Sequence, residues 1–315
     1  MAVSDEQFIG LWMRHGNPTD VAKELAVNIR NVFARRNRIE KRYGIDLKTV
    51  VDKRNGSTSP RIVLAVDKVR AIADIEGYVI VFSDAHFYPG EQSTGLQALV
   101  KVIKNLKPKL VIANGDILDG STIHSYAPQG WDRPPTLAAE LEAVKDAMGA
   151  IEKAAKGAIL HRTIGNHDIR FDRRLAASAS EYRDISGTKL SDHLPRWAES
   201  WSVMVNDNTM IKHRIHGGIH SAYNNTLKGG CNVVTGHTHL LEVKPWTDYT
   251  GRRYGVSTGM LADPMDTQFK YAEDNPRPWC QGFAILKYDS EGMLLPPELC
   301  EIVNGAAYFR GGVVV

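Results

Sequence analysis

Four short polar clusters contain the residue types that bind metal ions. Each cluster follows a run of apolar residues that is typical of a β-strand, so each lies where a strand gives way to a loop. The clusters are Asp84-Ala85-His86, Gly115-Asp116-Ile117-Leu118-Asp119, Gly165-Asn166-His167-Asp168 and Gly236-His237-Thr238-His239. Carboxylates, imidazoles and an amide at strand ends predict a metal site with enough ligands for two ions.

The spacing inside the clusters indicates how the side chains converge. Alternation along an extended strand would put Asp84 and His86 on one side, and His237 and His239 share that spacing. A glycine opens three of the four clusters and lets the backbone approach closely. Buried carboxylates repel one another unless cations lie between them, so hydrogen bonding alone explains the set poorly.

From residue 61 onward the sequence alternates strands and helices. The apolar runs at residues 79–82 and 110–113 indicate strands that are buried on both faces. We predict helices over residues 96–105 and 137–155, and strands over residues 61–66, 78–83, 110–114, 158–164, 203–205, 210–213, 233–235, 254–256 and 283–288. The first half is therefore α/β, and the second half is richer in consecutive strands.

In their order along the chain, the patterns D-x-H, G-D-x-x-D, G-N-H-D and G-H-T-H resemble the signature of the calcineurin-like metallophosphoesterase superfamily. The resemblance covers residues 78 to about 262. It implies an α/β (α+β) fold, a four-layer αββα metallophosphoesterase sandwich, preceded here by a small all-α domain. It also implies an enzyme, a metal-dependent phosphoric ester hydrolase.

The resemblance implies two divalent metal ions. The implied ligands of the first ion are Asp84, His86 and His239. Those of the second are Asn166 and His237, and Asp116 would bridge the two ions. Mixed nitrogen and oxygen ligands suit Mn, Fe or Zn better than Ca, and we expect Mn, with Fe or Zn as alternatives.

The second ion needs one more histidine from the segment before the last cluster. The candidates are His213, His216 and His220. His213 ends a predicted strand, and His216-Gly217-Gly218 resembles the His-Gly-Gly of the Ser/Thr protein phosphatases. His213 and His216 are both retained as candidate ligands, ahead of His220.

The resemblance assigns His167 no metal. It would be the general acid near the leaving-group oxygen, oriented by Asp119. Ser/Thr protein phosphatases carry Arg after the second Asp of G-D-x-x-D, whereas this sequence has Gly120, which argues against a dedicated phosphoprotein role. Arg170 is a candidate substitute for that phosphate-binding arginine, and His124 is a further candidate substrate contact.

The N-terminal segment is predicted to hold three helices between residues 5 and 43, the second over residues 21–26 and the third over residues 29–43. Thr19 or Asp20 can cap the second helix. The third helix is basic, which makes this segment the first place to look for contact with a polyanion.

This segment resembles a helix-turn-helix DNA-binding module. In that motif a small residue of the second helix packs against an apolar residue of the third, here Ala22 and Val32. Ala26 stands where the turn usually has Gly, and Asn28 follows as a polar cap. The alternative is a three-helix cap with a solvated charged face. The candidate DNA contacts, to bases or phosphates, are Asn28, Arg30, Asn31, Arg35, Arg36 and Arg38.

Charge and composition support a division into domains. Residues 1–60 hold 11 Lys and Arg against 7 Asp and Glu, a net charge of +4, and the remaining 255 residues hold 28 against 29, a net charge of −1. We expect a basic helical domain at 1–45, a polar linker at 46–60 and a metallophosphoesterase domain at 61–315.

Further features of the sequence indicate the cellular compartment. No run of about 18 apolar residues exists, so we expect no membrane span. The three cysteines are widely spaced and form neither a zinc pattern nor a disulfide framework. The first residues lack the basic start and apolar stretch of a secretory signal, so we expect none. We expect a cytoplasmic protein, in the host cytoplasm if it is phage-encoded, because phage-type chains with this domain pair are similar.

Three functions follow from these patterns. The first is a dimetal phosphodiesterase or nuclease that the N-terminal module directs to double-stranded DNA. The alternative is a phosphomonoesterase acting on a nucleotide, a small molecule or a phosphoprotein, with the N-terminal module binding a partner. The third is a non-enzymatic DNA-binding regulator. The presence of both His167 and Asp119, a candidate general acid and the residue that would orient it, argues against this third function. The sequence predicts no oligomeric state and does not separate endo- from exonuclease.

Overall fold

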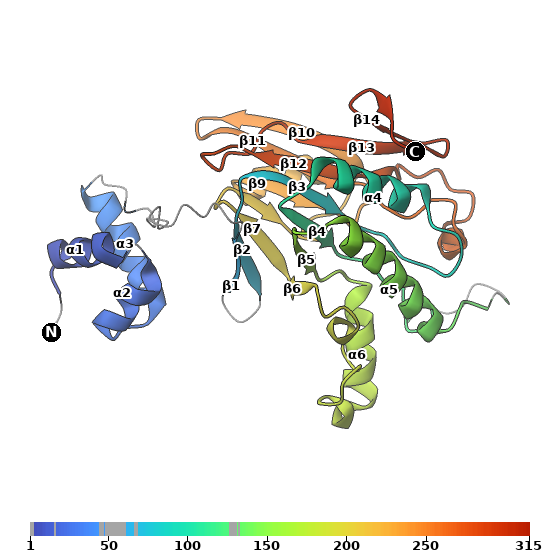
Figure 1. Cartoon of the computed structure of the whole chain (residues 1–315), viewed down its shortest axis with the longest axis horizontal. Coiled ribbons are helices and arrows are strands. Elements are labelled where there is room, and N and C mark those ends of the chain that lie inside the picture. Colours follow the sequence, from blue (N-terminus) through green and yellow to red (C-terminus); the bar gives the residue numbers. More distant parts are fainter. Residues whose placement is uncertain are drawn as a thin grey trace. The chain divides into compact units, whose positions relative to one another are not determined.

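The chain forms two compact units, residues 1–59 and residues 60–315 (Figure 1). The structure, a computed structural model, describes residues 3–15, 17–43, 47, 61–65, 69–125, 131 and 133–315. Apart from Leu47, the predicted linker at 46–60 lies outside the described residues. Each unit is described by itself.

The smaller unit contains the three predicted helices. They are α1 (Asp5–His15), α2 (Pro18–Leu25) and α3 (Ile29–Tyr43). Ala22 and Val32 are buried in one hydrophobic cluster with Trp12, as the helix-turn-helix pattern predicts. Apolar side chains from all three helices therefore hold the unit together.

The ends of these helices follow local chemistry. The prediction that Thr19 or Asp20 caps α2 is wrong, because the Asn17 side chain accepts a hydrogen bond from the Asp20 backbone N–H at 2.9 Å. Proline fits the first helical position, where its missing N–H costs nothing, and Pro18 therefore places the cap one residue before it. Ala26 adopts the left-handed conformation with φ of 50°, and Asn28 accepts from the Arg30 N–H at 2.8 Å.

One sheet of the larger unit has the strand order β15-β14-β13-β12-β3-β4-β5-β6. Its strands are β3 (Gly77–Phe82), β4 (Leu110–Asn114), β5 (Ile159–Thr163), β6 (Ala198–Ser200), β12 (Gln281–Tyr288), β13 (Glu298–Val303), β14 (Ala306–Phe309) and β15 (Gly312–Val313). Strands β3 to β6 run parallel, and β12 pairs antiparallel with β3. Every residue of β4 is buried, which confirms the interpretation of its apolar run.

The other sheet has the strand order β1-β2-β7-β8-β9-β11-β10. Its strands are β1 (Arg61–Ala65), β2 (Arg70–Asp74), β7 (Ser202–Val205), β8 (Thr209–Ile211), β9 (Asn232–Thr235), β10 (Leu241–Asp248) and β11 (Gly251–Thr258). The predictions missed β2, β6 and β10. They expected the last fifty residues to form strands that pack on the sheet, which β13, β14 and β15 confirm, but gave these three strands no bounds. Strand β10 has no buried residue and contains Pro245, which is tolerated because the strand lies at the edge of the sheet.

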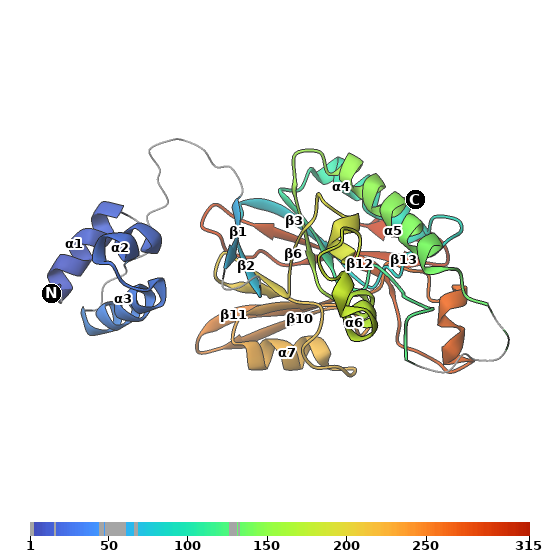
Figure 2. The same cartoon turned by 90° about the horizontal axis from the view of Figure 1, so that it is seen from below.

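Helices cover the outer faces of the two sheets. Helices α4 (Thr94–Leu106) and α5 (Leu137–Ala154) lie on the eight-stranded sheet, and α7 (Ser221–Gly229) packs on β9, β10 and β11 of the other (Figure 2). A second apolar core, with Val81, Ile112 and Val234, lies between the sheets. The predicted four-layer αββα sandwich is confirmed.

Shorter elements complete the larger unit. Helix α6 (Asp168–Ser178), which the predictions missed along with α7, projects from the body (Figure 1). The short helical turns are η2 (Ser180–Tyr182), η3 (Leu190–His193) and η4 (Thr267–Ala272). Across the described ranges, no helix combines the length and apolarity that crossing a bilayer requires.

A buried histidine in β5 makes stability depend on pH. The His161 side chain is fully buried with Nε2 2.8 Å from Ser200 Oγ, and burial, reinforced by the Arg162 charge, lowers its pKa to about 4. The unfolded chain takes up this proton near pH 6.5, about 2.5 pH units before the folded chain does. Folding stability is therefore present above about pH 6.5 and is lost as the pH falls toward about 4.

Between about pH 7.5 and pH 5, His161 should make the parent lose about 2 kcal/mol of its free energy of unfolding. We predict that His161→Gln, whose side chain cannot titrate, does not lose this amount. Denaturant midpoints of parent and variant across this range measure the difference. Two parallel pH profiles would contradict the prediction.

Candidate metal centre

The four polar clusters meet at the carboxyl ends of strands from both sheets. Strands β3, β4 and β5 end just before the first three clusters, and β9 ends just before the fourth. Strand β8, which is parallel to β9, ends two residues before His213. Parallel strands end at a common edge, and this edge is where the predicted ligands gather.

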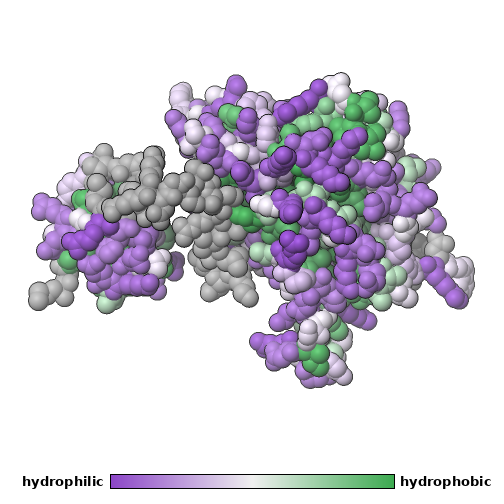
Figure 3. Space-filling view, viewed as in Figure 1, coloured by the Kyte–Doolittle hydropathy of each residue, from purple (hydrophilic) through white to green (hydrophobic). Residues whose placement is uncertain are grey.

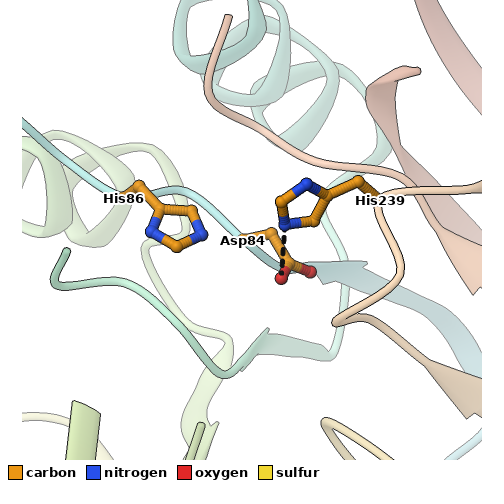
Figure 4. Close-up of side chains that lie close together, drawn as sticks. All are labelled: Asp84, His86 and His239. Carbon is orange, nitrogen blue, oxygen red and sulfur yellow. Dashed lines mark ion pairs between the residues drawn. The ribbon is translucent and has the colours of Figure 1, made fainter. Parts of the chain in front are cut away.

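Asp84, His86 and His239 form the first group of converging side chains (Figure 4). Their potential ligand atoms lie within 4.8 Å of one another, and His239 Nε2 is 3.2 Å from Asp84 Oδ1. All three residues are buried. Among the described residues, the buried His86 Nε2 has no hydrogen-bond partner, so it is available to a ligand such as a metal ion.

Asp116, His213 and His237 form the second group, again within 4.8 Å of one another. His213 Nε2 is 3.1 Å from Asp116 Oδ2 and 3.1 Å from Asn166 Oδ1. The Nδ1 atom of His213 lies 2.8 Å from the Asn114 carbonyl oxygen, a partner that fixes the ring and directs Nε2 at the cluster.

The structure separates the three candidate histidines. His213 is in the second group. His216 is exposed, with Nε2 3.2 Å from Lys228 Nζ, and His220 is exposed immediately before α7. Neither belongs to a group of converging ligand atoms in the described part of the chain. Of the three, only His213 converges with other potential ligands in the described part of the chain, because it follows β8 at the shared edge.

Asp116 lies between the two groups. Besides its neighbours His213 and His237, it comes within 4.8 Å of His86 and His167 in a third group. One carboxylate oxygen faces His213, and the other accepts a hydrogen bond from the His167 backbone N–H at 2.7 Å. This central place is the one that a bridging carboxylate needs.

The backbone of the ligand residues is not extended, and the alternation argument is therefore wrong. Strand β3 ends at Phe82, and five candidate ligands have positive φ. They are Asp84 (50°), His86 (39°), Asp116 (54°), His237 (68°) and His239 (58°). The left-handed conformation costs a non-glycine residue roughly 1–2 kcal/mol. The side chains converge because each strand end turns sharply, not because alternate residues face one way.

Glycines allow these turns to approach each other. A Cβ atom on Gly165 would lie closer than 3.0 Å to the backbone N and the carboxylate of Asp116, and one on Gly236 closer than 3.0 Å to the carboxylate of Asp84. The glycine that opens each of these clusters therefore leaves room for a carboxylate of another cluster, as the close-approach interpretation predicts.

Two buried carboxylates were not assigned roles from the sequence. Asp168 accepts hydrogen bonds from the backbone N–H groups of Gly165, Asp116, Ile117 and Leu118 at 3.0–3.3 Å. It thereby ties the loop after β5 to the loop after β4. Its place as the last residue of G-N-H-D was a signal that could have been used.

Glu140 of α5 acts similarly on the loop after Asp119. It accepts from the Gly120 N–H at 2.8 Å and from the Ser121 N–H at 3.2 Å. It is fully buried, and burial raises the pKa of its carboxyl group. No local pattern marks Glu140, because it reaches this loop from twenty residues away.

His167 lies beside the ligand groups, and its ring contacts Asp119 and Arg170. Nδ1 is 2.9 Å from the Asp119 carbonyl oxygen and 3.5 Å from its Oδ1, and Nε2 is 3.0 Å from Arg170. Since a guanidinium only donates, Nε2 accepts in this arrangement and Nδ1 carries the proton. Asp119 also holds His86 Nδ1 at 3.0 Å.

The site concentrates negative charge. Burial raises the pKa of Asp84, but the charges of His239 and His213 outweigh it and lower the pKa to about 2. Burial also raises the pKa of Asp116, but the charge and hydrogen bond of His213 outweigh this effect, and the pKa lies well below its usual value. In return, burial lowers but Asp116 raises the pKa of His213, to about 10. Two ionised carboxylates are thus buried together and need cations beside them.

For His167, burial lowers the pKa, but the hydrogen bond to Asp119 and the charge of Asp116 raise it above its ordinary value despite Arg170.

Aromatic rings close one side of the site. Trp279 lies 4.5 Å from His239 and Phe269 lies 5.3 Å from His86, measured between ring centroids. No role at the site was predicted for these rings.

A cavity of about 390 Å³ opens beside His86. Its lining includes the carboxylates of Glu91, Glu142, Asp146 and Asp266. His124 is half-buried in the loop after Gly120 and is not among the converging ligands.

The candidate DNA contacts divide into two kinds. Arg35 lies 3.0 Å from Asp5, and Arg36 lies 2.9 Å from Glu40, both in half-buried ion pairs within the small unit. The exposed candidates are Asn28, Arg30, Asn31 and Arg38. Asn28 also caps α3, so its side-chain oxygen already has a donor.

Residues 77–249, more than half of the chain, match the calcineurin-like phosphoesterase family. The chain belongs to this family, which implies divalent metal ions, and the donors that converge here fit such ions.

Several known proteins are similar to this chain. The Gene 54 protein of Mycobacterium phage D29 is 25% identical over 264 residues, covering 75% of this chain and 97% of that protein. The Gene 54 protein of Mycobacterium phage L5 is 25% identical over 267 residues, with the same coverage. An archaeal phosphodiesterase of known structure is 16% identical, with a TM-score of 0.37, covering 71% of this chain and 99% of that one.

We predict that Gly165→Ala lowers the amount of metal that the protein binds, because the added Cβ displaces Asp116. Metal content after dialysis against Mn and the thermal midpoint measure the effect. Gly149→Ala is the matched control. Its Cβ meets no atom within 4 Å inside α5, so we expect stabilisation by about 0.5–1 kcal/mol and unchanged metal content. Parent-like metal content in Gly165→Ala would contradict the placement of Asp116.

Proposed function

We propose that the protein is a dimetal phosphodiesterase that acts on DNA. The observation that carries the proposal is the convergence of seven candidate metal ligands at one edge of the sheets, with His167 beside them. These side chains are Asp84, His86, Asp116, Asn166, His213, His237 and His239. A structural metal site would not need a separate histidine and carboxylate pair next to its ligands.

One ion would be held by Asp84, His86 and His239, and the other by Asn166, His213 and His237, with Asp116 shared between them. Mixed imidazole and oxygen donors favour Mn, with Fe or Zn as alternatives. When bound, the ions would lower the pKa of a water and neutralise charge on the phosphoryl oxygens.

His167 would donate a proton to the leaving-group oxygen from Nε2. Asp119 and Asp116 raise the pKa of His167, which favours its acid form, and Asp119 fixes the ring through Nδ1. Arg170 must first leave Nε2, because both groups cannot donate to each other. A substrate phosphate that attracts Arg170 would therefore also free His167 to act as an acid.

Arg170 would take the place of the phosphate-binding arginine that this sequence lacks after Asp119. Its Cδ lies 3.8 Å from where a Cβ of Gly120 would be. The arginine thus fills the space of the missing side chain from a different element, α6. One arginine suits a diester, whose phosphate has a single negative charge, better than a doubly charged monoester.

The smaller unit would direct the enzyme to double-stranded DNA. Arg30 and Arg38 on α3 are exposed, and within the described ranges neither side chain has a hydrogen-bond or ion-pair partner. Arg35 and Arg36 hold the unit together instead. The phage relatives support action in the cytoplasm of a host cell.

We predict that His167→Ala lowers the turnover of bis-(p-nitrophenyl) phosphate by roughly 10²–10⁴-fold while metal content stays near that of the parent. Rates with Mn, and after removal of metal with a chelator, test both the acid and the metal. His216→Ala is the matched control and should keep metal and rate. The parent should prefer this diester to p-nitrophenyl phosphate and should cut linear DNA.

Two outcomes would overturn the assignment. A parent that prefers the monoester and leaves DNA intact is a phosphomonoesterase. A His167→Ala variant as fast as the parent shows that His167 is not the acid.

We predict that Arg30→Ala/Arg38→Ala weakens binding of a short duplex by the full chain. Each lost phosphate contact should flatten the slope of log affinity against log salt by about 0.9. Arg14→Ala changes an exposed arginine of α1 and should bind like the parent. A duplex affinity that does not respond to salt would favour the solvated three-helix cap.

A further inference from the structure

We propose that the arginines of α6 form a track for a single nucleic-acid strand that leads into the metal centre. The inference rests on the proposed function and specifies its substrate as a polynucleotide rather than a small diester. Arg170, Arg173 and Arg174 make up the track, which begins at the catalytic histidine.

The start of the track is fixed by contacts. Helix α6 begins at Asp168, directly after His167. Arg170 lies 3.0 Å from His167 Nε2 and 3.1 Å from the Asp119 carbonyl oxygen. A phosphate in the site is therefore already beside the first arginine of the helix.

The direction of the track follows from helix geometry. Residues three and four positions apart share a face, so Arg173 and Arg174 follow Arg170 on one side of α6, about 4.5–6 Å further along its axis. The other side of α6 faces the body. Phe171 is buried against His193, and Asp172 accepts from the Leu190 N–H.

The two arginines of the track beyond Arg170 are free to bind a ligand. Arg173 and Arg174 are both exposed, and in the described part of the chain neither side chain has a hydrogen-bond or ion-pair partner. Figure 1 shows α6 projecting from the body, and the surface there is mostly hydrophilic in Figure 3. Unpaired guanidinium groups in a row suit the phosphates of one strand.

The cavity beside His86 is unsuited to binding a nucleic-acid strand. Four carboxylates line it, Glu91, Glu142, Asp146 and Asp266, and they would repel a phosphate backbone. The charges around the metal centre therefore favour passage along α6.

The test compares Arg173→Ala/Arg174→Ala with the parent in the full-length, Mn-loaded protein. The substrates are bis-(p-nitrophenyl) phosphate and a labelled single-stranded DNA of 12 nucleotides. We expect unchanged hydrolysis of the small diester, which is too short to reach these residues. For the oligonucleotide, we expect kcat/KM to fall roughly twentyfold at about 0.1 M salt and the salt slope to flatten by about 1.4.

Two further variants separate charge from structure. Arg173→Lys/Arg174→Lys keeps the charges and should retain most of the oligonucleotide activity. Lys104→Ala/Lys153→Ala removes two exposed charges from α4 and α5 and should behave like the parent on both substrates.

The outcomes distinguish this inference from the proposed function. Equal oligonucleotide rates for Arg173→Ala/Arg174→Ala and the parent overturn the track and leave the phosphodiesterase intact. A parent that hydrolyses the small diester but not the oligonucleotide does the same. A parent that hydrolyses neither overturns both.

Discussion

Two ionised carboxylates, Asp84 and Asp116, are buried together at the edge where both sheets end. An unpaired buried charge is costly, so these groups require positive charge within contact distance. In the structure His239 and His213 lie against them, with Nε2 atoms 3.2 and 3.1 Å from the carboxylate oxygens. Divalent cations would supply this charge, since each ion can face several of these donors at once. The other features of the edge serve to hold these carboxylates in place.

Holding them requires backbone strain. Five candidate ligands adopt the left-handed conformation, at roughly 1–2 kcal/mol each. Such strain persists only where the surroundings fix the chain. Here the Asp84 N–H donates to the Gly115 carbonyl and the His86 N–H to the Asp116 carbonyl, both at 3.0 Å. Asp168 adds four backbone hydrogen bonds between two loops, so the strained turns are cross-linked on several sides.

The sequence predicts the chemistry of this edge better than its geometry. Apolar runs located β3 and β4, and their ends located the side chains that converge, because a buried strand has a strong local signal. Alternation along the strand was the wrong reason for the convergence of these side chains. The positive φ of Asp84 and His86 leaves no mark in the pattern of apolar residues, so it could not be predicted. Asp168 and Glu140 act on loops far from them in sequence. Strand β10 and helix α6 were missed because half-buried edge strands and charged, projecting helices lack a clean period.

Gly120 connects backbone conformation to substrate choice. Its φ is +68°, a conformation that arginine adopts only with strain, and Ile123 lies 3.1 Å from where a Cβ would be. This backbone therefore disfavours the arginine that Ser/Thr protein phosphatases carry after G-D-x-x-D. Arg170 reaches the same space from α6, whose exposed face continues with further arginines. Under the proposed function, the phosphate-binding charge would lie on a projecting helix instead of a loop, in line with groups that only a longer substrate would reach.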